Sequence, residues 1–177
     1  QSKGAKTAAV VNVMGSSIAR MVDKVILQGS GPEICVISTK AALSQMVVLT
    51  LLAMKLGLKN KVISKKVYQE NLKSLKELPA IIQGVLNERS GFIHRIANKY
   101  CKNKNWLYLG RGIYYPIALE SALKMKEVAY VHAEGMPAGF LKHGTLAMID
   151  DDISSIVFVP PKEKKDLYQS TIHSIEE

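Results

Sequence analysis

The sequence predicts an α/β protein with parallel sheets flanked by helices, organised as two incomplete domains that helices join. Short β-branched segments alternate with longer segments whose apolar residues recur every three or four positions. A Gly-rich turn follows two of the expected strands, at residues 29–33 and 110–112. Such alternation is typical of parallel βαβ units, because a parallel crossover needs a long connection, usually a helix.

The first half of the chain contains two expected strands and a long helix. The expected elements are a strand at 8–13, a helix at 18–22 capped by Ser16 or Ser17, a strand at 24–28 and a long helix from 38–40. Ser38 is most simply the N-cap of that long helix, although the same geometry also suits a sugar hydroxyl or a phosphate.

Helical patterns continue through the middle of the chain, and the boundary between the two halves falls among them. They cover 72–78, 79–86 and 92–100, with Pro79 in a first helical turn and a break at 90–91. We therefore expect one partial domain at residues 1–88 and a second at 89–177.

The second half again contains two expected strands. The expected elements are a strand at 106–109, a helix from Pro116 to about 131, a loop at 133–139, a short helical segment at 141–148, a strand at 153–159 and a helix from 163. The Gly-rich turn at 110–112 follows a strand and precedes a helix, where an anion binds favourably, but on its own it is a weak signal and a plain strand-to-helix turn is the simple interpretation.

Composition excludes several classes of function. The net charge is +9, but the lysines are spread among apolar residues and no arginine-rich stripe or aromatic RNA-binding motif accompanies them. We therefore expect no nucleic-acid partner, while a site for a phosphorylated small molecule stays open. The longest nearly apolar run, 46–54, is too short to cross a membrane, and no signal region opens the chain.

The cysteines and histidines indicate neither disulfides nor a metal. Cys35 and Cys101 are far apart and form no CxxC motif, which fits a cytoplasmic protein. His132 and Glu134 resemble the H-x-E of zinc deaminases, but the P-C-x-x-C that such a site needs is missing from the sequence. We expect no metal and no cofactor.

One helix carries charges at a spacing that suits chemistry. Glu120, Lys124 and Glu127 follow one another by four and three residues, which puts them on one helical face among apolar neighbours. The pattern fits a functional site and an ordinary ion pair equally well. His143 lies in a polar, Gly-flanked segment and is a plausible acid or base near neutral pH.

Read together, these segments resemble the isomerase half of the glutamine:fructose-6-phosphate aminotransferase family, the glucosamine 6-phosphate synthases. The segments are LGRGIYYPIALESALKMKE at 109–127, HAE at 132–134, PAG at 137–139, LKHG at 141–144, NVMGS at 12–16 and GPEICVISTK at 31–40. They follow the family's order along nearly the whole chain.

The resemblance implies a fold and an activity. The isomerase half of the family consists of two sugar-isomerase (SIS) domains, each a parallel sheet flanked by helices. Residues 1–88 then correspond to the second half of the first SIS domain and 89–177 to the first half of the second. The family makes glucosamine 6-phosphate from fructose 6-phosphate and glutamine, with a glutaminase domain that supplies ammonia, and we expect a homodimer.

The resemblance also assigns roles to five residues. Glu127 matches the carboxylate that moves a proton between C1 and C2, and Lys124 matches the lysine beside it. His143 matches the histidine that opens the sugar ring, supplied across a dimer interface. Val36 and Ser38 match residues that line the sugar site.

Some features depart from the family pattern. Thr145, Phe140 and Cys35 stand where the family usually has Pro, Glu and Gly, and the first two bear on the positioning of the His143 loop. The family's phosphate loop and its Schiff-base lysine are not in the sequence, so we expect a fragment that is inactive alone. The alternatives are another SIS-type sugar-phosphate isomerase or deglycase, and a non-catalytic module that binds sugar phosphates.

Overall fold

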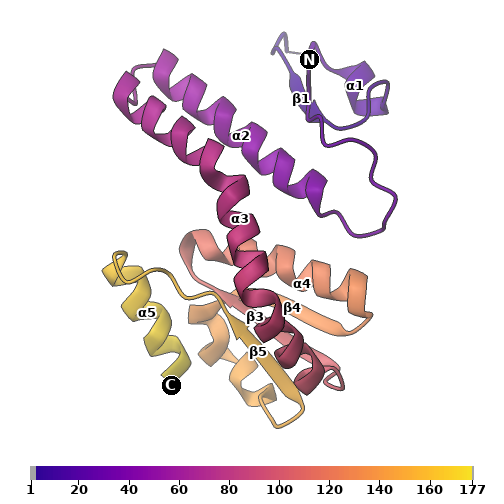
Figure 1. Ribbon diagram of the computed structural model, residues 1–177, viewed down its shortest axis with the longest axis vertical. Coiled ribbons are helices and arrows are strands. Elements are labelled where there is room, and N and C mark those ends of the chain that lie inside the picture. The colour runs from indigo at the N-terminus through magenta and orange to yellow at the C-terminus, as the bar shows by residue number, and fades with distance from the viewer. Residues whose placement is uncertain (1–2, 177) are drawn as a thin grey trace. The chain divides into compact units, whose positions relative to one another are not determined.

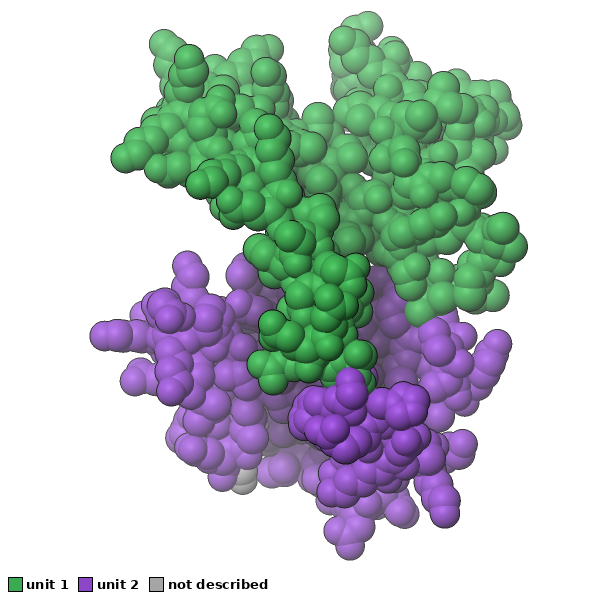
Figure 2. Space-filling view, viewed as in Figure 1, with its two compact units in different colours: residues 1–90 green, residues 91–177 purple. Residues whose placement is uncertain are grey.

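A computed structural model describes residues 3–176. Contacts divide the chain into two compact units, residues 1–90 and 91–177, which Figure 2 colours green and purple. The sequence places the boundary at 88–89, and the assignment of the two units to halves of two SIS domains stays a prediction.

Unit 1 begins with a small parallel βαβ motif. β1 (Ala8–Val11) pairs in parallel with β2 (Lys24–Leu27), and α1 (Ser17–Met21) lies between them in the chain (Figure 1). The side chain of Ser16 accepts a hydrogen bond from the backbone N–H of Ala19 at 3.3 Å, which confirms the predicted cap. Both strands end at the same edge, because Val11 pairs with Leu27.

Two long helices complete unit 1. α2 (Lys40–Lys59) begins after its N-cap, Thr39, so the prediction that Ser38 is the N-cap was wrong by one residue. By length and composition α2 is apolar enough to cross a membrane, with a mean hydropathy of 1.7 and 6% of its most apolar stretch buried, although a core helix passes the same test. The estimate from the run 46–54 missed this because a polar residue inside a helix interrupts a run without ending the helix.

α3 (Lys65–Tyr100) is one continuous helix that runs into unit 2 (Figure 1). The predicted division into three helices was wrong, because Pro79 and Gly91 both lie inside it. A proline inside a helix removes one hydrogen bond and a glycine costs about 1 kcal/mol relative to alanine. Neither cost ends a helix whose other residues favour the helical state.

Unit 2 contains a three-stranded parallel sheet with the order β4-β3-β5. Its elements are β3 (Asn105–Gly110), η1 (Gly112–Tyr114), α4 (Tyr115–Ala129), β4 (His132–Pro137), η2 (Ala138–His143), η3 (Thr145–Met148), β5 (Ile153–Val157) and α5 (Lys165–Glu176). The prediction of a loop at 133–139 was wrong, because most of that segment is β4. Its sequence HAEGMP has little β propensity, and pairing with all six residues of β3 makes it a strand.

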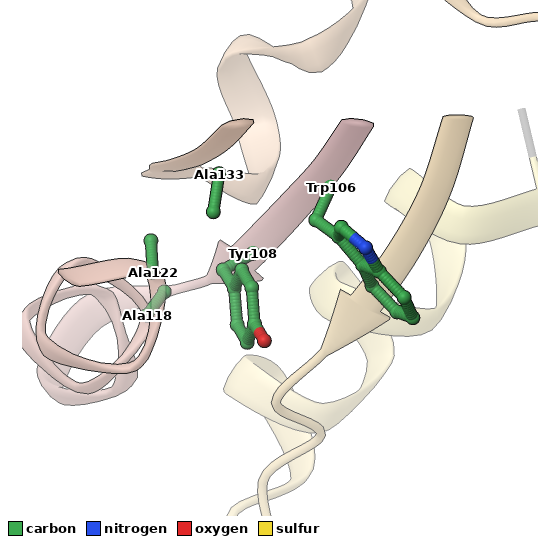
Figure 3. Close-up of a cluster of buried hydrophobic side chains, with 5 residues drawn as sticks. All are labelled: Trp106, Tyr108, Ala118, Ala122 and Ala133. Atoms are coloured by element: carbon green, nitrogen blue, oxygen red, sulfur yellow. The ribbon is translucent and has the colours of Figure 1, made fainter. Parts of the chain in front are cut away.

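The core of unit 2 lies on both faces of the central strand β3. Figure 3 shows one cluster, in which Trp106 and Tyr108 lie on the same side as Ala118 and Ala122 of α4 and Ala133 of β4. The alternate residues of β3 form a second cluster on the other face: Leu107 and Leu109, with Met136 and Ala138. Burial on both faces is typical of parallel strands and explains why β3 carries large apolar side chains at every position from 106 to 109.

Two glycines are required by close backbone approach. A Cβ at Gly110 would lie 2.1 Å from the carbonyl oxygen of Tyr114, inside the tight turn that starts η1. A Cβ at Gly135 would lie 2.7 Å from the Cα of Leu119, where α4 crosses β4. These glycines let the helix that carries the charged face pack directly on the sheet.

Candidate functional site

The charged face of α4 forms a three-residue network. The Nζ atom of Lys124 donates a hydrogen bond to Oε2 of Glu127 at 2.6 Å and lies 3.3 Å from Oε1 of Glu120. The side chains of Lys124 and Glu127 are 22% and 21% exposed, against 45% for Glu120. The structure therefore brings together both carboxylates that the spacing predicts, and it adds Glu120 to the pair implied by the resemblance.

This network favours the charged form of its lysine. The hydrogen bond to Glu127 raises the pKa of Lys124, partial burial opposes the rise, and Glu120 adds to it. Lys124 therefore stays an ammonium near neutral pH. A fixed ammonium beside Glu127 suits a carboxylate that must hold or pass a proton.

His143 lies at the other end of the sheet from this network. It ends η2, which follows the carboxyl end of β4, whereas Glu127 lies near the end of α4, just before β4 begins. A six-residue strand separates those ends by roughly 17 Å. The ring of His143 packs edge-on against Phe140, with 6.3 Å between ring centroids. The structure thus does not bring His143 into the Lys124 network of its own chain.

Arg111 connects the sheet edge of unit 2 to the last helix. Its Nη1 donates hydrogen bonds to the backbone oxygen of Ser170 at 3.0 Å and to Oγ of Ser174 at 3.1 Å, both on α5. The guanidinium also lies beside Gly139 of η2. The sequence indicated only a turn at 110–112, either plain or anion-binding, and the contacts of Arg111 with α5 carried no local signal.

The two predicted sugar-binding residues lie in unit 1, in the loop between β2 and α2. Val36 is 80% exposed, and Oγ of Ser38 donates a hydrogen bond to Oε2 of Glu33 at 3.3 Å. Oε1 of Glu33 accepts hydrogen bonds from the backbone N–H groups of Thr39 at 3.0 Å and Ala41 at 3.2 Å. Glu33 is therefore the residue that caps α2, a role that sequence reasoning missed because the carboxylate reaches across six to eight residues.

The side chains that could bind a metal do not cluster in the described part of the chain. Among residues 3–176 no three His, Cys, Asp or Glu side chains lie close enough together to hold a metal ion. The charged network on α4 contains its own cation, Lys124, in the place between two carboxylates.

Known proteins match this chain over its full length. Residues 99–174 match the SIS domain family. Glutamine–fructose-6-phosphate aminotransferase (isomerizing) from Methanococcus maripaludis is 42% identical over 100% of the chain, and that from Aquifex aeolicus is 40% identical over 100%. The chain spans 28% of the length of each of these relatives.

Solved structures agree with these relatives. The C-terminal domain of glucosamine-fructose-6-phosphate aminotransferase from Francisella tularensis is 34% identical, with a TM-score of 0.86 over 95% of this chain and 47% of that chain. A protein described as a phosphosugar isomerase from Clostridium difficile has a TM-score of 0.83 at 22% identity, over 96% of this chain and 50% of that chain, and shows the fold alone. Over its whole length the chain is therefore similar to glutamine–fructose-6-phosphate aminotransferases, over 95% of it to the C-terminal domain of one of them, and its fold is of the SIS type.

Proposed function

We propose that this chain is part of the isomerase domain of an enzyme that makes glucosamine 6-phosphate from fructose 6-phosphate and glutamine. The observation that carries the proposal is the Lys124–Glu127 hydrogen bond of 2.6 Å on α4, within a chain similar throughout to these aminotransferases. The activity combines amino transfer with ketose–aldose isomerisation. The nitrogen comes from glutamine through a glutaminase domain elsewhere in the enzyme.

The network on α4 suits the isomerisation step. Moving a hydrogen from C1 to C2 of an open-chain sugar needs one base that takes a proton and returns it to the neighbouring carbon. In this proposal Glu127 is that base, acting through Oε1, while Lys124 holds Oε2 and fixes the carboxylate in place. Glu120 balances the charge of Lys124 from the opposite side. No cofactor takes part in these steps.

The remaining proposed site residues come from elsewhere. Because Glu127 and His143 lie toward opposite ends of β4, the histidine that opens the ring over Glu127 comes from the second subunit of a homodimer. Val36 and Ser38 contact the sugar from the loop that precedes α2. We place the enzyme in the cytoplasm, where Cys35 and Cys101 remain the exposed free thiols of the structure.

Strand order and exposed surface support the view that the chain is part of a larger protein. The order β4-β3-β5 corresponds to strands 2-1-3 of a doubly wound 2-1-3-4-5 sheet, and the parallel pair β1-β2 suits strands 4 and 5 of another such sheet. The chain has 13,006 Å² of accessible surface, whereas two compact domains of half its mass would together have about 10,300 Å². In this proposal protein, not lipid, covers the apolar sides of α2.

A single substitution in the full-length protein encoded by the gene tests this proposal. We expect Glu127→Gln to lower kcat for glucosamine 6-phosphate formation by a hundredfold or more, the usual contribution of a general base being about 10²–10⁴-fold. The matched control is Glu77→Gln, which removes a carboxylate from an exposed helical pair with Lys73 at 3.9 Å. It should leave kcat unchanged.

Two other outcomes would contradict the proposal. A well-folded full-length protein that makes no product from fructose 6-phosphate and glutamine would favour a different sugar-phosphate reaction or a binding module. Activity that survives Glu127→Gln would keep the overall reaction and remove Glu127 from its proposed role.

A further inference from the structure

The loop between β2 and α2 is fixed at its start by two side chains. Nδ2 of Asn12 donates to the backbone oxygen of Gly31 at 2.7 Å, and Oδ1 of Asn12 accepts from the backbone N–H of Ser30 at 3.2 Å. Nε2 of Gln28 donates to Oγ of Ser30 at 3.1 Å and to the backbone oxygen of Ala41 at 2.5 Å. Asn12 and Gln28 follow β1 and β2 directly, so both act at the carboxyl edge of the sheet, where α/β sheets bind ligands.

Glu33 fixes the end of the same loop and sets the polarity of Ser38. The hydrogen bonds from the backbone amides lower the pKa of Glu33, so this carboxylate is ionised near neutral pH. An ionised carboxylate only accepts hydrogen bonds, and therefore the hydroxyl of Ser38 must donate its one proton to Glu33. Ser38 then offers only oxygen lone pairs to a ligand.

Glu33 also occupies the place where an anion would otherwise bind. The free N–H groups at a helix start attract phosphates and carboxylates. At α2 the N–H groups of Thr39 and Ala41 already point to Glu33. A phosphate approaching them would meet a negative carboxylate and a hydroxyl oxygen with no proton to give.

We infer that this loop is a hydroxyl-binding subsite that rejects phosphate, in which Glu33 is a positioning residue that makes Ser38 an acceptor for a sugar hydroxyl. The inference rests on the proposed function for the identity of the sugar and deepens it. It resolves the choice that the sequence left open at Ser38 in favour of the hydroxyl. The phosphate of the substrate must therefore bind elsewhere.

Glu33→Gln should reverse the direction in which the hydroxyl of Ser38 donates its hydrogen bond. The amide oxygen still accepts from a backbone N–H, while the new amide N–H₂ donates to Ser38, whose own proton then turns toward the ligand. In the full-length enzyme we expect the KM for fructose 6-phosphate to rise roughly tenfold, the value of one charge-assisted hydrogen bond, with kcat changed less than about threefold. Glu70→Gln, which removes an exposed carboxylate 4.0 Å from Lys66, is the matched control and should change neither constant.

A double-mutant cycle separates positioning from a general effect on the fold. Because Glu33 acts through Ser38, adding Glu33→Gln to Ser38→Ala should raise KM little beyond Ser38→Ala alone. Independent, multiplying effects of the two substitutions, or an unchanged KM in Glu33→Gln, would overturn the inference.

A second measurement does not depend on turnover. Inorganic phosphate should slow hydrogen exchange at the amides of residues 39–41 in a Glu33→Ala protein, which leaves the N–H groups of Thr39 and Ala41 uncovered, and not in the parent protein. Equal phosphate protection in both would overturn the inference even if the enzyme is active. Protection confined to the variant would support it even if no aminotransferase activity is found, so the two proposals fail separately.

Discussion

The two units of this chain use similarly apolar sequences with different results. In unit 2 the strand β3 has a neighbour on each side and apolar clusters on both faces, and nine apolar residues are buried there, from Trp106 to Ala138. Among the described residues of unit 1 the buried apolar residues are Val11 and Met54. Because α2 has a mean hydropathy of 1.7 and yet only 6% of its most apolar stretch is buried, the difference shows that burial depends on how many layers surround an element and not on its composition alone.

The proposed site residues are held in different ways in the two units. The charged network on α4 rests on a packed sheet, so its geometry is held by the core of unit 2. The loop with Ser38 is held instead by hydrogen bonds that Asn12 and Gln28 donate and that Glu33 accepts. Apolar packing and side-chain hydrogen bonding are two ways to preorganise functional side chains, and a substitution can disrupt either one without the other.

The largest expected contrast comes from removing one leucine side chain in each unit. Leu107 is 3% exposed and Leu56 is 57% exposed. Leu107→Ala should lower the free energy of unfolding by about 2–5 kcal/mol through lost burial and a cavity. Leu56→Ala should lower it by about 0.5 kcal/mol or less. Urea unfolding of the 177-residue chain, with hydrogen exchange used to monitor each unit separately, measures the loss of unfolding free energy in both variants. Equal losses would show that unit 1 is covered in solution.

A glycine pair gives the next contrast, with effects of opposite sign. Gly135→Ala puts a methyl group 2.7 Å from the backbone of Leu119 and should destabilise unit 2 by about 1–3 kcal/mol, because α4 must move off the sheet. Gly84→Ala lies in open space on α3 and should stabilise that helix by up to about 1 kcal/mol. Thermal unfolding of the two variants checks the signs, and a neutral Gly135→Ala would mean that α4 packs less closely than the structure shows.

The smallest effects concern pH, and the two units should respond at opposite ends of the scale. The pKa of Glu33 is lowered mainly by the N–H of Ala41, with a smaller effect from Lys40. The contribution of Glu33 to folding stability is therefore fully present above its ordinary pKa and is lost as the pH falls through the lowered pKa. The pKa of Lys124 is raised mainly by its hydrogen bond to Glu127. The contribution of Lys124 to folding stability is therefore fully present below its ordinary pKa and is lost as the pH rises through the raised pKa.

NMR titration of the two groups measures this response directly. We expect loosening of residues 33–41 only at acid pH and of the α4 network at alkaline pH. Loosening of both at the same pH would indicate that one global transition, rather than these two local groups, sets the response.

Much of the secondary structure and one part of the site could be predicted from the sequence alone. β1, β2, β3 and β5 were recognisable from short β-branched or aromatic runs between turn residues, and the spacing of Glu120, Lys124 and Glu127 placed them on one face of α4. These features depend on residues within one or two turns of each other, so the local pattern carries them.

Tertiary structure decided the features whose partners lie far along the chain. HAEGMP became β4 only through its ladder to β3, and α3 continued through Pro79 and Gly91 where local rules predicted breaks. Glu33 became the cap of α2, and with it the hydroxyl of Ser38 acquired its direction, because the loop folds back over several residues. A sequence pattern records the preference of each residue, whereas a strand pairing or a long-range hydrogen bond exists only once both partners have been brought together.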